Sequence, residues 1–462
     1  MRIDGKNIET LLENGPASRD AVFDVIKKAR EAKGLAIEEA AVLLRAGDHD
    51  AVSAILDAAG AVKERVFGKR VVLFAPLYLS NFCTNGCLYC GFRSANKTVA
   101  RKALEIEEVV KEAAALVEMG FKRVLLVTGE DPRWGLDYII ACVRAVYEKT
   151  GMRIVHVNAP PMDVAGFREL KKAGVGVFQA FQETYHSETY GKMHPWGMKK
   201  EFAFRLGVMD RALEAGFEDV GIGPLLGLYD FKFEILSSIA HSLHLYERFG
   251  AHAHTISVPR LRPAEGGALG APPYPVNDDE FKKAVAVLRL TVPSAGVVIS
   301  TREPAGLRRE LLHIGATQLS AASRTNPGGY TNGGGKEILE QFSTNDHRTL
   351  SEVMASIVEE GGLPSLCTSC YRSGRVGGNF TEKTVKGEME RFCHANAILT
   401  LKEYIADSSS PRFRHARAGN GVKGLFQGAL NAALDEIKDE AMKKAVMEKL
   451  KELENGKRDV YF

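Results

Sequence analysis

Residues 71–92 decide the fold, and they read VVLFAPLYLSNFCTNGCLYCGF. Their first part, VVLFAP, is a short apolar run rich in β-branched residues, which is typical of a buried strand. Cys83, Cys87 and Cys90 follow it in a loop with C-x3-C-x2-C spacing. The stretch therefore predicts a strand whose carboxyl end carries three thiols.

Seven further apolar runs follow this strand along the chain. They begin at Val124, Ile154, Val177, Asp219, His254, Val297 and Thr317. Longer amphipathic stretches lie between them, such as residues 103–120 and 232–250, and each of these two closes with glycine, a common helix stop. Strand and helix alternating eight times predict an α/β fold of the (β/α)8 barrel type.

The chain divides into three predicted parts. Residues 1–65 form a helical segment, because apolar positions such as Leu35 and Leu44 recur at helical spacing without β-branched runs. Residues 66–345 form the barrel. Residues 346–462 form a mainly helical C-terminal domain, which carries a second group of thiols, Cys367, Cys370 and Cys393.

Charge and composition limit the class of ligand. Lys and Arg total 61 against 58 Asp and Glu, so the net charge is only +3 over 462 residues, which predicts no binding to nucleic acid or anionic lipid. The seven cysteines are too few and too scattered for a disulfide scaffold. The sequence has no apolar run of membrane-spanning length, and its first residues lack a targeting pattern. We therefore expect a cytoplasmic protein with small-molecule ligands.

The first cysteine group favours an iron–sulfur cluster. A compact loop can bring three thiolates onto three irons of one 4Fe-4S cube, and no fourth cysteine lies nearby, so one iron stays open to a ligand. The alternatives are a zinc site that lacks a ligand and three unrelated buried thiols. Zinc sites usually pair C-x2-C with a second close pair or with histidine, which disfavours zinc here.

This loop resembles the cluster motif of the radical S-adenosylmethionine (SAM) superfamily, which follows the first strand of such a barrel. The resemblance implies that the open iron binds SAM and that an electron from the cluster cleaves SAM to a 5′-deoxyadenosyl radical. It also implies a SAM site at the carboxyl ends of the strands, with Glu130 for the SAM amino group. Arg205, in the predicted helix after the fourth strand, is the candidate for the SAM carboxylate. Thr128, Asn158 and Glu183 are the other predicted residues of this site.

Five further stretches resemble the aromatic amino acid lyase branch of that superfamily. They read QETYHSETYGKMHP, GIGPLLGLYDFKFE, SVPRLRPA, STREPAGLRRELL and SRTNPGGY, all between residues 182 and 330. The resemblance implies that the Cα–Cβ bond of tyrosine is cleaved to give p-cresol and dehydroglycine. The tyrosine carboxylate needs a cation, and bidentate geometry favours arginine. Arg302, with Ser300 beside it, is the preferred candidate, and Arg324 is the alternative.

The second cysteine group has the spacing C-x2-C-x22-C. This pattern resembles the hydrogenase-maturing members of the branch and is absent from the thiamine-synthesising ones. The resemblance implies a second 4Fe-4S cluster that holds a labile iron through a bridging amino acid, cysteine or a similar one, and that converts dehydroglycine to CO and cyanide. The alternative is a zinc ion held by the three thiols and His394.

A histidine at the other end of the barrel is the predicted ligand of the labile iron. His254 begins the sixth predicted strand, so it should lie at the amino-terminal mouth of the barrel, opposite the first cluster. The resemblance implies that a histidine in this HTIS context binds the extra iron. His252 has the same strand parity and is the alternative ligand.

The sequence thus predicts a radical SAM tyrosine lyase of the FeFe-hydrogenase maturase type, which supplies CO and cyanide for assembly of the H-cluster. The resemblance implies a flavodoxin or ferredoxin as electron donor and the maturation proteins HydE and HydF as partners. Two alternatives stay open. One is a lyase of the thiamine type with a structural second metal, and the other is a metal-cluster scaffold without radical chemistry.

Overall fold

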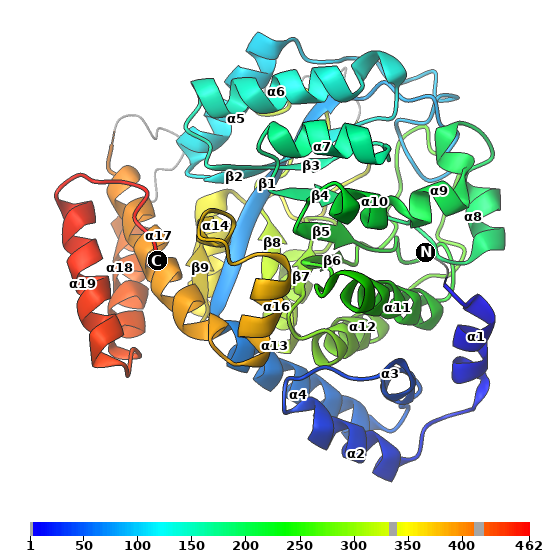
Figure 1. The fold of residues 1–462 in the computed structure, drawn as a ribbon, viewed down its shortest axis with the longest axis horizontal. Coiled ribbons are helices and arrows are strands. Elements are labelled where there is room, and N and C mark those ends of the chain that lie inside the picture. Colours follow the sequence, from blue (N-terminus) through cyan, green and yellow to red (C-terminus); the bar gives the residue numbers. More distant parts are fainter. Residues whose placement is uncertain (1–2, 332–339, 411–419) are drawn as a thin grey trace.

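Four helices precede the barrel in the computed structural model, which describes residues 3–331, 340–410 and 420–462 (Figure 1). They are α1 (Gly5–Glu13), α2 (Arg19–Ala29), α3 (Ile37–Leu44) and α4 (His49–Phe67). The last of them, α4, packs against α12 and α13 of the barrel and α17 of the tail. The predicted helical segment at the start of the chain is confirmed.

Eight parallel strands form a closed barrel, which confirms the predicted fold class. They are β1 (Arg70–Ser80), β2 (Arg123–Thr128), β3 (Ile154–Asn158), β4 (Val177–Gln179), β5 (Asp219–Ile222), β6 (Thr255–Ser257), β7 (Gly296–Ile299) and β8 (Gln318–Ser320). Each strand pairs with the next, and β1 pairs with both β2 and β8, which closes the ring. Every strand begins within one residue of its predicted start.

Helices surround the strands (Figure 1). They are α5 (Ile106–Met119), α6 (Leu136–Lys149), α7 (Val164–Lys172), α8 (Ser187–Met193), α9 (Phe202–Leu206), α10 (Val208–Glu214), α11 (Phe231–Phe249), α12 (Asp278–Thr291) and α13 (Ala305–Ile314), with short 3₁₀ turns η1 (Pro132–Trp134) and η2 (Met198–Lys200). Gly120 and Gly250 end α5 and α11 in the left-handed conformation, as glycine at a helix end favours.

The tail after the barrel is mainly helical, as predicted. It contains α14 (Leu350–Glu359), β9 (Leu363–Ser365), α15 (Ser369–Arg372), α16 (Gly377–Val385), α17 (Met389–Asp407), α18 (Asn420–Asp435) and α19 (Glu440–Glu454). The short strand β9 was not predicted. It pairs with residues 70–72 of β1, whereas β2 pairs with residues 75–80, so β9 extends the sheet beyond the amino-terminal end of β2.

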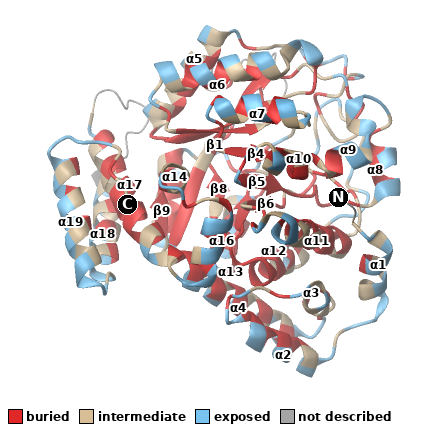
Figure 2. Ribbon diagram, viewed as in Figure 1, coloured by how far each residue is buried: buried red, intermediate tan, exposed pale blue. Residues whose placement is uncertain are grey.

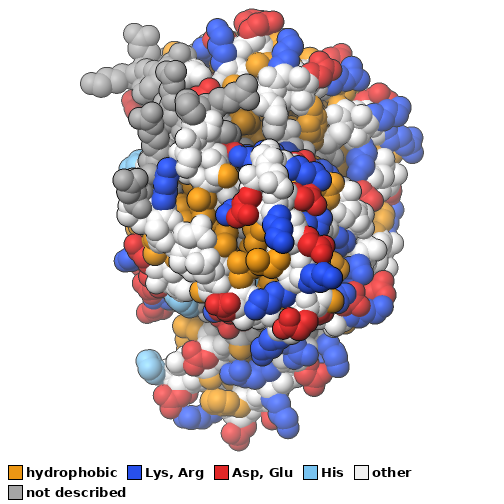
Figure 3. All heavy atoms as spheres, turned by 90° about the vertical axis from the view of Figure 1, so that its left-hand side faces the viewer, with side chains coloured by type: hydrophobic (Ala, Val, Ile, Leu, Met, Phe, Trp, Pro, Cys, Tyr) orange, Lys and Arg blue, Asp and Glu red, His pale blue; other side chains and the backbone are white. Residues whose placement is uncertain are grey.

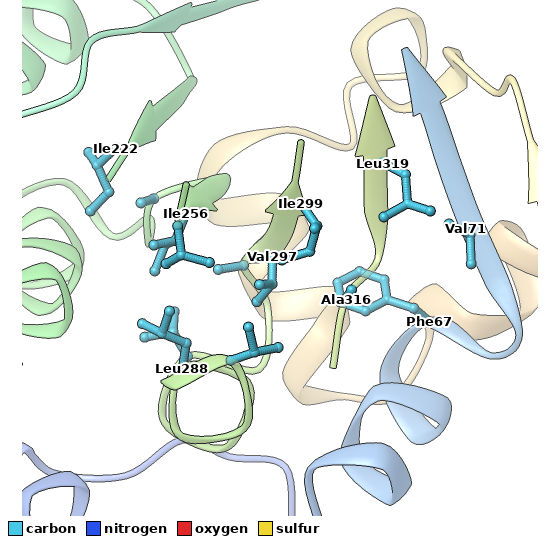
Figure 4. Close-up of a cluster of buried hydrophobic side chains, with 14 of the residues drawn as sticks. Phe67, Val71, Ile222, Ile256, Leu288, Val297, Ile299, Ala316 and Leu319 are labelled. Atoms are coloured by element: carbon cyan, nitrogen blue, oxygen red, sulfur yellow. The ribbon is translucent and has the colours of Figure 1, made fainter. Parts of the chain in front are cut away.

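The hydrophobic core lies between the strands and the helices. Figure 4 shows side chains of β1, β5, β6, β7 and β8 meeting Phe67 of α4 and Leu288 of α12, all of them buried. Most strand residues are buried, whereas α18 and α19 present much exposed surface (Figure 2). These helices lie toward the face seen in Figure 3, where acidic and basic side chains are intermixed. Apolar burial of this kind is the main favourable term in folding.

All seven cysteines lie within the described residues and are free thiols. Cys142, buried in α6, is part of the core. Among the described helices, none combines the length and the apolar character that a membrane crossing requires.

Candidate active site

A pocket at the carboxyl end of the barrel contains the first cysteine group. Cys83, Cys87 and Cys90 line it together with most of the other residues predicted for SAM and substrate, and we call it the first pocket. Those residues are Thr128, Glu130, Asn158, Glu183, Arg205, Ser300 and Arg302. They come from the ends of different strands, the usual place for the active site of such a barrel. Arg324 does not line this pocket, and its side chain is exposed.

One arginine holds both ends of the first cysteine loop. Arg101 Nη1 donates to the carbonyl oxygens of Asn81 (2.6 Å) and Phe92 (2.8 Å), and its Nη2 donates to that of Arg93 (2.7 Å). Within the loop, Gly86 packs so closely under the ring of Trp196 that any Cβ would collide with it. The loop is therefore fixed at both ends and covered over its middle before any ligand binds.

Glu130 and Arg205 form a buried ion pair in the first pocket. Arg205 Nη1 lies 2.8 Å from Glu130 Oε1, and Asn85 Nδ2 donates to Glu130 Oε2 at 2.7 Å. Burial raises the pKa of Glu130, but the charges of Arg205 and Lys199 outweigh it and hold the pKa below its usual value. Glu130 is therefore an anion that faces the thiols, as binding of an ammonium group requires.

Glu183 lies in the first pocket on a left-handed backbone, with a φ of 71°. This conformation is uncommon for residues other than glycine and marks strained loops at functional sites. Lys199 Nζ lies 2.6 Å from Glu183 Oε1. The loop after Glu183 is held by the buried carboxyl group of Glu234, which accepts hydrogen bonds from Thr184 Oγ1 (2.5 Å) and from the Tyr185 amide (2.9 Å).

Arg302 is the cation of this pocket that has no carboxylate partner. Within the described residues its guanidinium makes neither a hydrogen bond nor an ion pair, and it lies over the Phe342 ring at 3.3 Å. Burial lowers its pKa to about 10, so it stays charged at neutral pH. Because the positive charges of Lys199 and Arg205 are already matched by Glu183 and Glu130, Arg302 can accept the carboxylate of a ligand.

Three residues of the first pocket were not predicted. Asn85 and Lys199 hold the carboxylates described above, and Tyr89 donates its hydroxyl to Nε2 of buried His194 at 2.8 Å. The other nitrogen of His194, Nδ1, lies 2.8 Å from the carbonyl oxygen of Tyr190, which places its proton on Nδ1. The signal for Asn85 and Tyr89 was their position inside the cysteine motif, whereas nothing local marks Lys199.

A second pocket lies at the amino-terminal mouth of the barrel. It is lined by Cys367, Cys370 and Cys393 and by His254. Neither His252 nor His394 lines it. His252 stacks on Tyr246 with ring centroids 4.5 Å apart, and Nε2 of His394 lies 2.8 Å from the carbonyl oxygen of Ala433. The geometry thus favours His254 over His252 and removes the fourth ligand from the zinc alternative.

Both cysteine groups fit a cluster better than a single ion. Three thiols line each pocket, yet in the described parts of the chain no three His, Cys, Asp or Glu side chains converge closely enough to hold one metal ion. A cube takes one thiolate at each of three corners, so its ligands need not converge. The donor set and its spread therefore suit an iron–sulfur cube in each pocket.

The comparisons with known proteins agree with this geometry. Family models of the Radical SAM superfamily and of the Biotin and Thiamin Synthesis associated domain match residues 77–239 and residues 257–362. The chain is 32% identical to 2-iminoacetate synthase of Escherichia coli (strain K12) over 353 residues, which cover 76% of this chain and 90% of that protein.

Two solved structures are more similar still. A crystal structure of HydG, a maturase of the FeFe-hydrogenase, has a TM-score of 0.93 and 41% identity and covers 100% of this chain and 99% of its own. HydG from Carboxydothermus hydrogenoformans has a TM-score of 0.83 and 37% identity, with 96% of each chain covered. The chain therefore belongs to the radical SAM enzymes, which hold a 4Fe-4S cluster and SAM, and within them to the lyase family of 2-iminoacetate synthase and HydG.

Proposed function

We propose that this enzyme cleaves tyrosine to p-cresol and dehydroglycine and then converts dehydroglycine to CO and cyanide for hydrogenase maturation. The observation that carries the first step is Arg302, a half-buried cation without a carboxylate partner that faces the first cysteine group. Similarity to 2-iminoacetate synthase and to HydG supports a lyase reaction in this pocket.

The residues of the first pocket bind and orient SAM. The Glu130 carboxylate takes the amino group of SAM, and Arg205 turns from Glu130 toward the SAM carboxylate while keeping its buried position. Asn158, Thr128 and the Glu183–Lys199 pair contact the remaining polar groups of SAM. When bound, the cluster and SAM supply the radical that takes a hydrogen atom from the substrate.

Arg302 and Ser300 hold the amino acid substrate. The planar guanidinium binds the carboxylate of tyrosine through two parallel hydrogen bonds, and the Phe342 ring stacks against one face of the guanidinium. Ser300 lies two residues earlier on the same strand end and gives a hydroxyl to the same ligand. After one hydrogen atom has been taken from tyrosine, breaking the Cα–Cβ bond gives dehydroglycine and a p-cresol radical, which one electron from the reductant and one proton convert to p-cresol.

The second pocket supports the second step. Cys367, Cys370 and Cys393 would hold a further cluster, and His254 would hold an additional labile iron with the help of a bridging cysteine or similar amino acid. Dehydroglycine contains the atoms of CO, hydrogen cyanide and one water, so the conversion is redox-neutral. Similarity to HydG over the whole chain, against 76% for 2-iminoacetate synthase, supports this step over the thiamine-type alternative.

The inside of the barrel offers a route between the two pockets. On β8, Gln318 lines the second pocket and Ser320 lines the first. On β7, Gly296 lines the second pocket and Val298 lines the first. Residues two apart on a strand are about 7 Å apart. Bulky branched residues usually fill this layer, whereas here a glycine and polar side chains form part of it, which supports passage of a small polar molecule.

Two assays test the proposal. Anaerobically reconstituted protein with SAM, tyrosine and a reductant should form p-cresol, and deoxyhaemoglobin should trap CO. Formation of p-cresol and glyoxylate without CO would establish the thiamine-type lyase. No p-cresol and about four irons per chain would overturn the proposal. The electron donor, flavodoxin or ferredoxin, and the partners HydE and HydF belong to the same proposal, as do the domain limits at residues 65 and 345.

A further inference from the structure

Tyr371 occupies the space between the second pocket and the inside of the barrel. It directly follows Cys370 in α15, and its side chain lines the second pocket. Its ring centroid lies 5.0 Å from that of His156 and 5.7 Å from that of His254, and the Arg123 guanidinium lies 5.6 Å from it.

These three contacts come from different parts of the barrel wall. Arg123 begins β2, His156 lies in β3, and His254 directly precedes β6. A single ring that touches all three reaches across the amino-terminal mouth. His156 pairs in register with Leu125, which lines the first pocket, so the ring of Tyr371 extends to the level at which the first pocket begins.

The space that the ring covers is polar. His156 Nδ1 and Thr255 Oγ1 are buried and have no hydrogen-bond partner within the described residues. Gly296 and Gly221 let polar side chains pack closely here, because a Cβ at Gly296 would collide with Gln318 Nε2, and one at Gly221 would come within 2.6 Å of Thr255 Oγ1. Buried polar atoms without partners are costly, so they indicate a ligand or water that passes or rests there.

The hydroxyl of Tyr371 also engages the nitrogen that the labile iron needs. Tyr371 Oη lies 3.1 Å from His254 Nε2. The other ring nitrogen, Nδ1, lies 3.2 Å from Asp219 Oδ1 without the alignment of a hydrogen bond, and Asp219 is itself fixed by the Gly377 amide at 2.9 Å. A carboxylate beside Nδ1 favours the proton there and leaves the lone pair on Nε2. That lone pair can accept the tyrosine hydroxyl or bind a metal ion, but not both.

We propose that Tyr371 closes the amino-terminal mouth of the barrel and competes with iron for Nε2 of His254. When the labile iron binds His254, the ring of Tyr371 is released from this histidine. The passage from the barrel to the second pocket therefore opens only after the iron that receives dehydroglycine has bound. This inference rests on the proposed function, since it assigns a residue to the transfer of dehydroglycine between the two pockets.

Iron titration tests the competition. Fe(II) is added anaerobically, without SAM or tyrosine, to protein that already holds both clusters, and the additional iron bound is measured against a chelator of known affinity. Tyr371→Phe removes one hydrogen bond to His254 and should bind that iron about 2- to 10-fold more tightly than the wild type. Equal or weaker binding would overturn the competition. Tyr147→Phe is the matched control, because its hydroxyl bonds to the Gly174 carbonyl oxygen and the Val155 amide and Tyr147 lines neither pocket, so its loss should leave iron affinity unchanged.

The fate of the product tests closure of the mouth. Tyr371→Ala removes the ring, so water reaches dehydroglycine and hydrolyses it to glyoxylate and ammonia. The ratio of glyoxylate to p-cresol should rise several-fold and the ratio of CO to p-cresol should fall, whereas Tyr371→Phe should keep both ratios near those of the wild type. Unchanged ratios in a folded Tyr371→Ala protein would show that the ring is not a barrier.

The iron titration and the product ratios distinguish failure of this inference from failure of the proposed function. If wild-type protein formed no p-cresol, the proposed function would fail, while the iron titration would still decide the competition for His254. If p-cresol and CO formed normally but neither variant changed affinity or product ratio, the role of Tyr371 would fail and the proposed function would stand.

Discussion

The two cysteine groups lie at opposite ends of β1. They differ in whether the polar and charged groups around them have partners within the protein. Cys83, Cys87 and Cys90 come from one short loop, and apart from Arg302 the charges that face them are paired with each other, Glu130 with Arg205 and Glu183 with Lys199. Cys370 lies in α15 and Cys393 in α17, whereas Cys367 lies in the segment just before α15. Buried polar atoms without hydrogen bonds gather around this second group, among the described residues at Arg70 Nε, Arg123 Nε, Asp219 Oδ2 and His254 Nδ1.

This difference indicates two kinds of site. The first is organised in advance, which suits a reaction whose geometry must exclude side reactions of a radical. The second leaves several polar groups unsatisfied, which suits a site completed by further ligands such as an additional iron and an amino acid.

The largest expected effect comes from removing one cysteine of either group, because the two losses should abolish different products. Cys83→Ala removes a ligand of the first cluster and should reduce p-cresol, CO and 5′-deoxyadenosine to background. Cys367→Ala should still form p-cresol and 5′-deoxyadenosine, since the first pocket is intact, but should form no CO. Product analysis by liquid chromatography with CO trapping measures both. If Cys367→Ala also stopped p-cresol formation in a folded protein, the two sites would not be independent.

The next effect concerns substrate binding in the first pocket. A charge-assisted hydrogen bond contributes about 1.5–3 kcal/mol, so Arg302→Met should raise the KM for tyrosine about 10- to 100-fold. Arg302→Lys should recover part of this loss, because lysine keeps the charge but not the bidentate geometry. SAM binding, measured by titration, should stay unchanged.

Arg324→Met provides the control for Arg302, because Arg324 is exposed and outside the pocket. It should leave the KM for tyrosine close to that of the wild type. A larger rise in KM for Arg324→Met than for Arg302→Met would reverse the assignment of the substrate carboxylate.

A third prediction concerns the sulfur ligands of the second group. Arg70 Nη2 lies 3.5 Å from Cys393 Sγ, whereas the first group receives its hydrogen bonds from neutral donors, the Phe92 amide and Gln341 Nε2 to Cys90. A cation beside a thiolate stabilises the reduced, more negative cluster.

Removing that cation should therefore lower the reduction potential of the proposed second cluster only. A difference of ~1.4 kcal/mol between the two oxidation states corresponds to about 60 mV for one electron. Arg70→Met should shift the second potential down by about that amount in a redox titration followed by EPR, with Arg70→Lys intermediate. A shift of the first cluster, or none at all, would contradict a local role for Arg70.

Local sequence patterns predicted most of the barrel and little of what supports its sites. The eight strands are apolar β-branched runs, and the cysteine spacing lies within one loop, so both are readable from neighbouring residues. The strand β9 has only three residues, one of them Pro364, and is defined by pairing with β1 almost 300 residues earlier. Lys199 and Tyr371 owe their positions to contacts with distant parts of the chain, such as Asn85 and His254, and no local pattern marks them. Arg101 contacts carbonyl oxygens only 5 to 20 residues earlier, but an arginine in a loop carries no pattern that marks such a role.

The choice between alternative residues also needed the fold. Arg302 and Arg324 both follow strands in the sequence, and only the closed barrel puts one at the pocket and the other outside it. His252 and His254 share strand parity, yet the turn before β6 directs them to different neighbours, Tyr246 and Tyr371.

The smallest expected effect is a pH dependence of folding stability that comes from a residue beneath the first pocket. Glu234, which holds the loop after Glu183, is fully buried, and burial raises its pKa to about 8. Since its pKa in the unfolded chain is near 4.5, the folded state binds the proton more tightly. Its contribution to stability is therefore fully present below about pH 4.5 and is lost as the pH rises through 8.

Glu234→Gln cannot ionise, so it should lack this loss. The melting temperature of the wild type should fall by a few degrees relative to that of Glu234→Gln between pH 6.5 and pH 8.5, as followed by circular dichroism. Buried histidines such as His241, whose pKa burial lowers to about 3, affect both proteins alike and cancel in the difference. A difference in melting temperature that stayed constant with pH would mean that Glu234 is ionised in the folded protein, and that the loop beneath the first pocket is held by a charge and not by a proton.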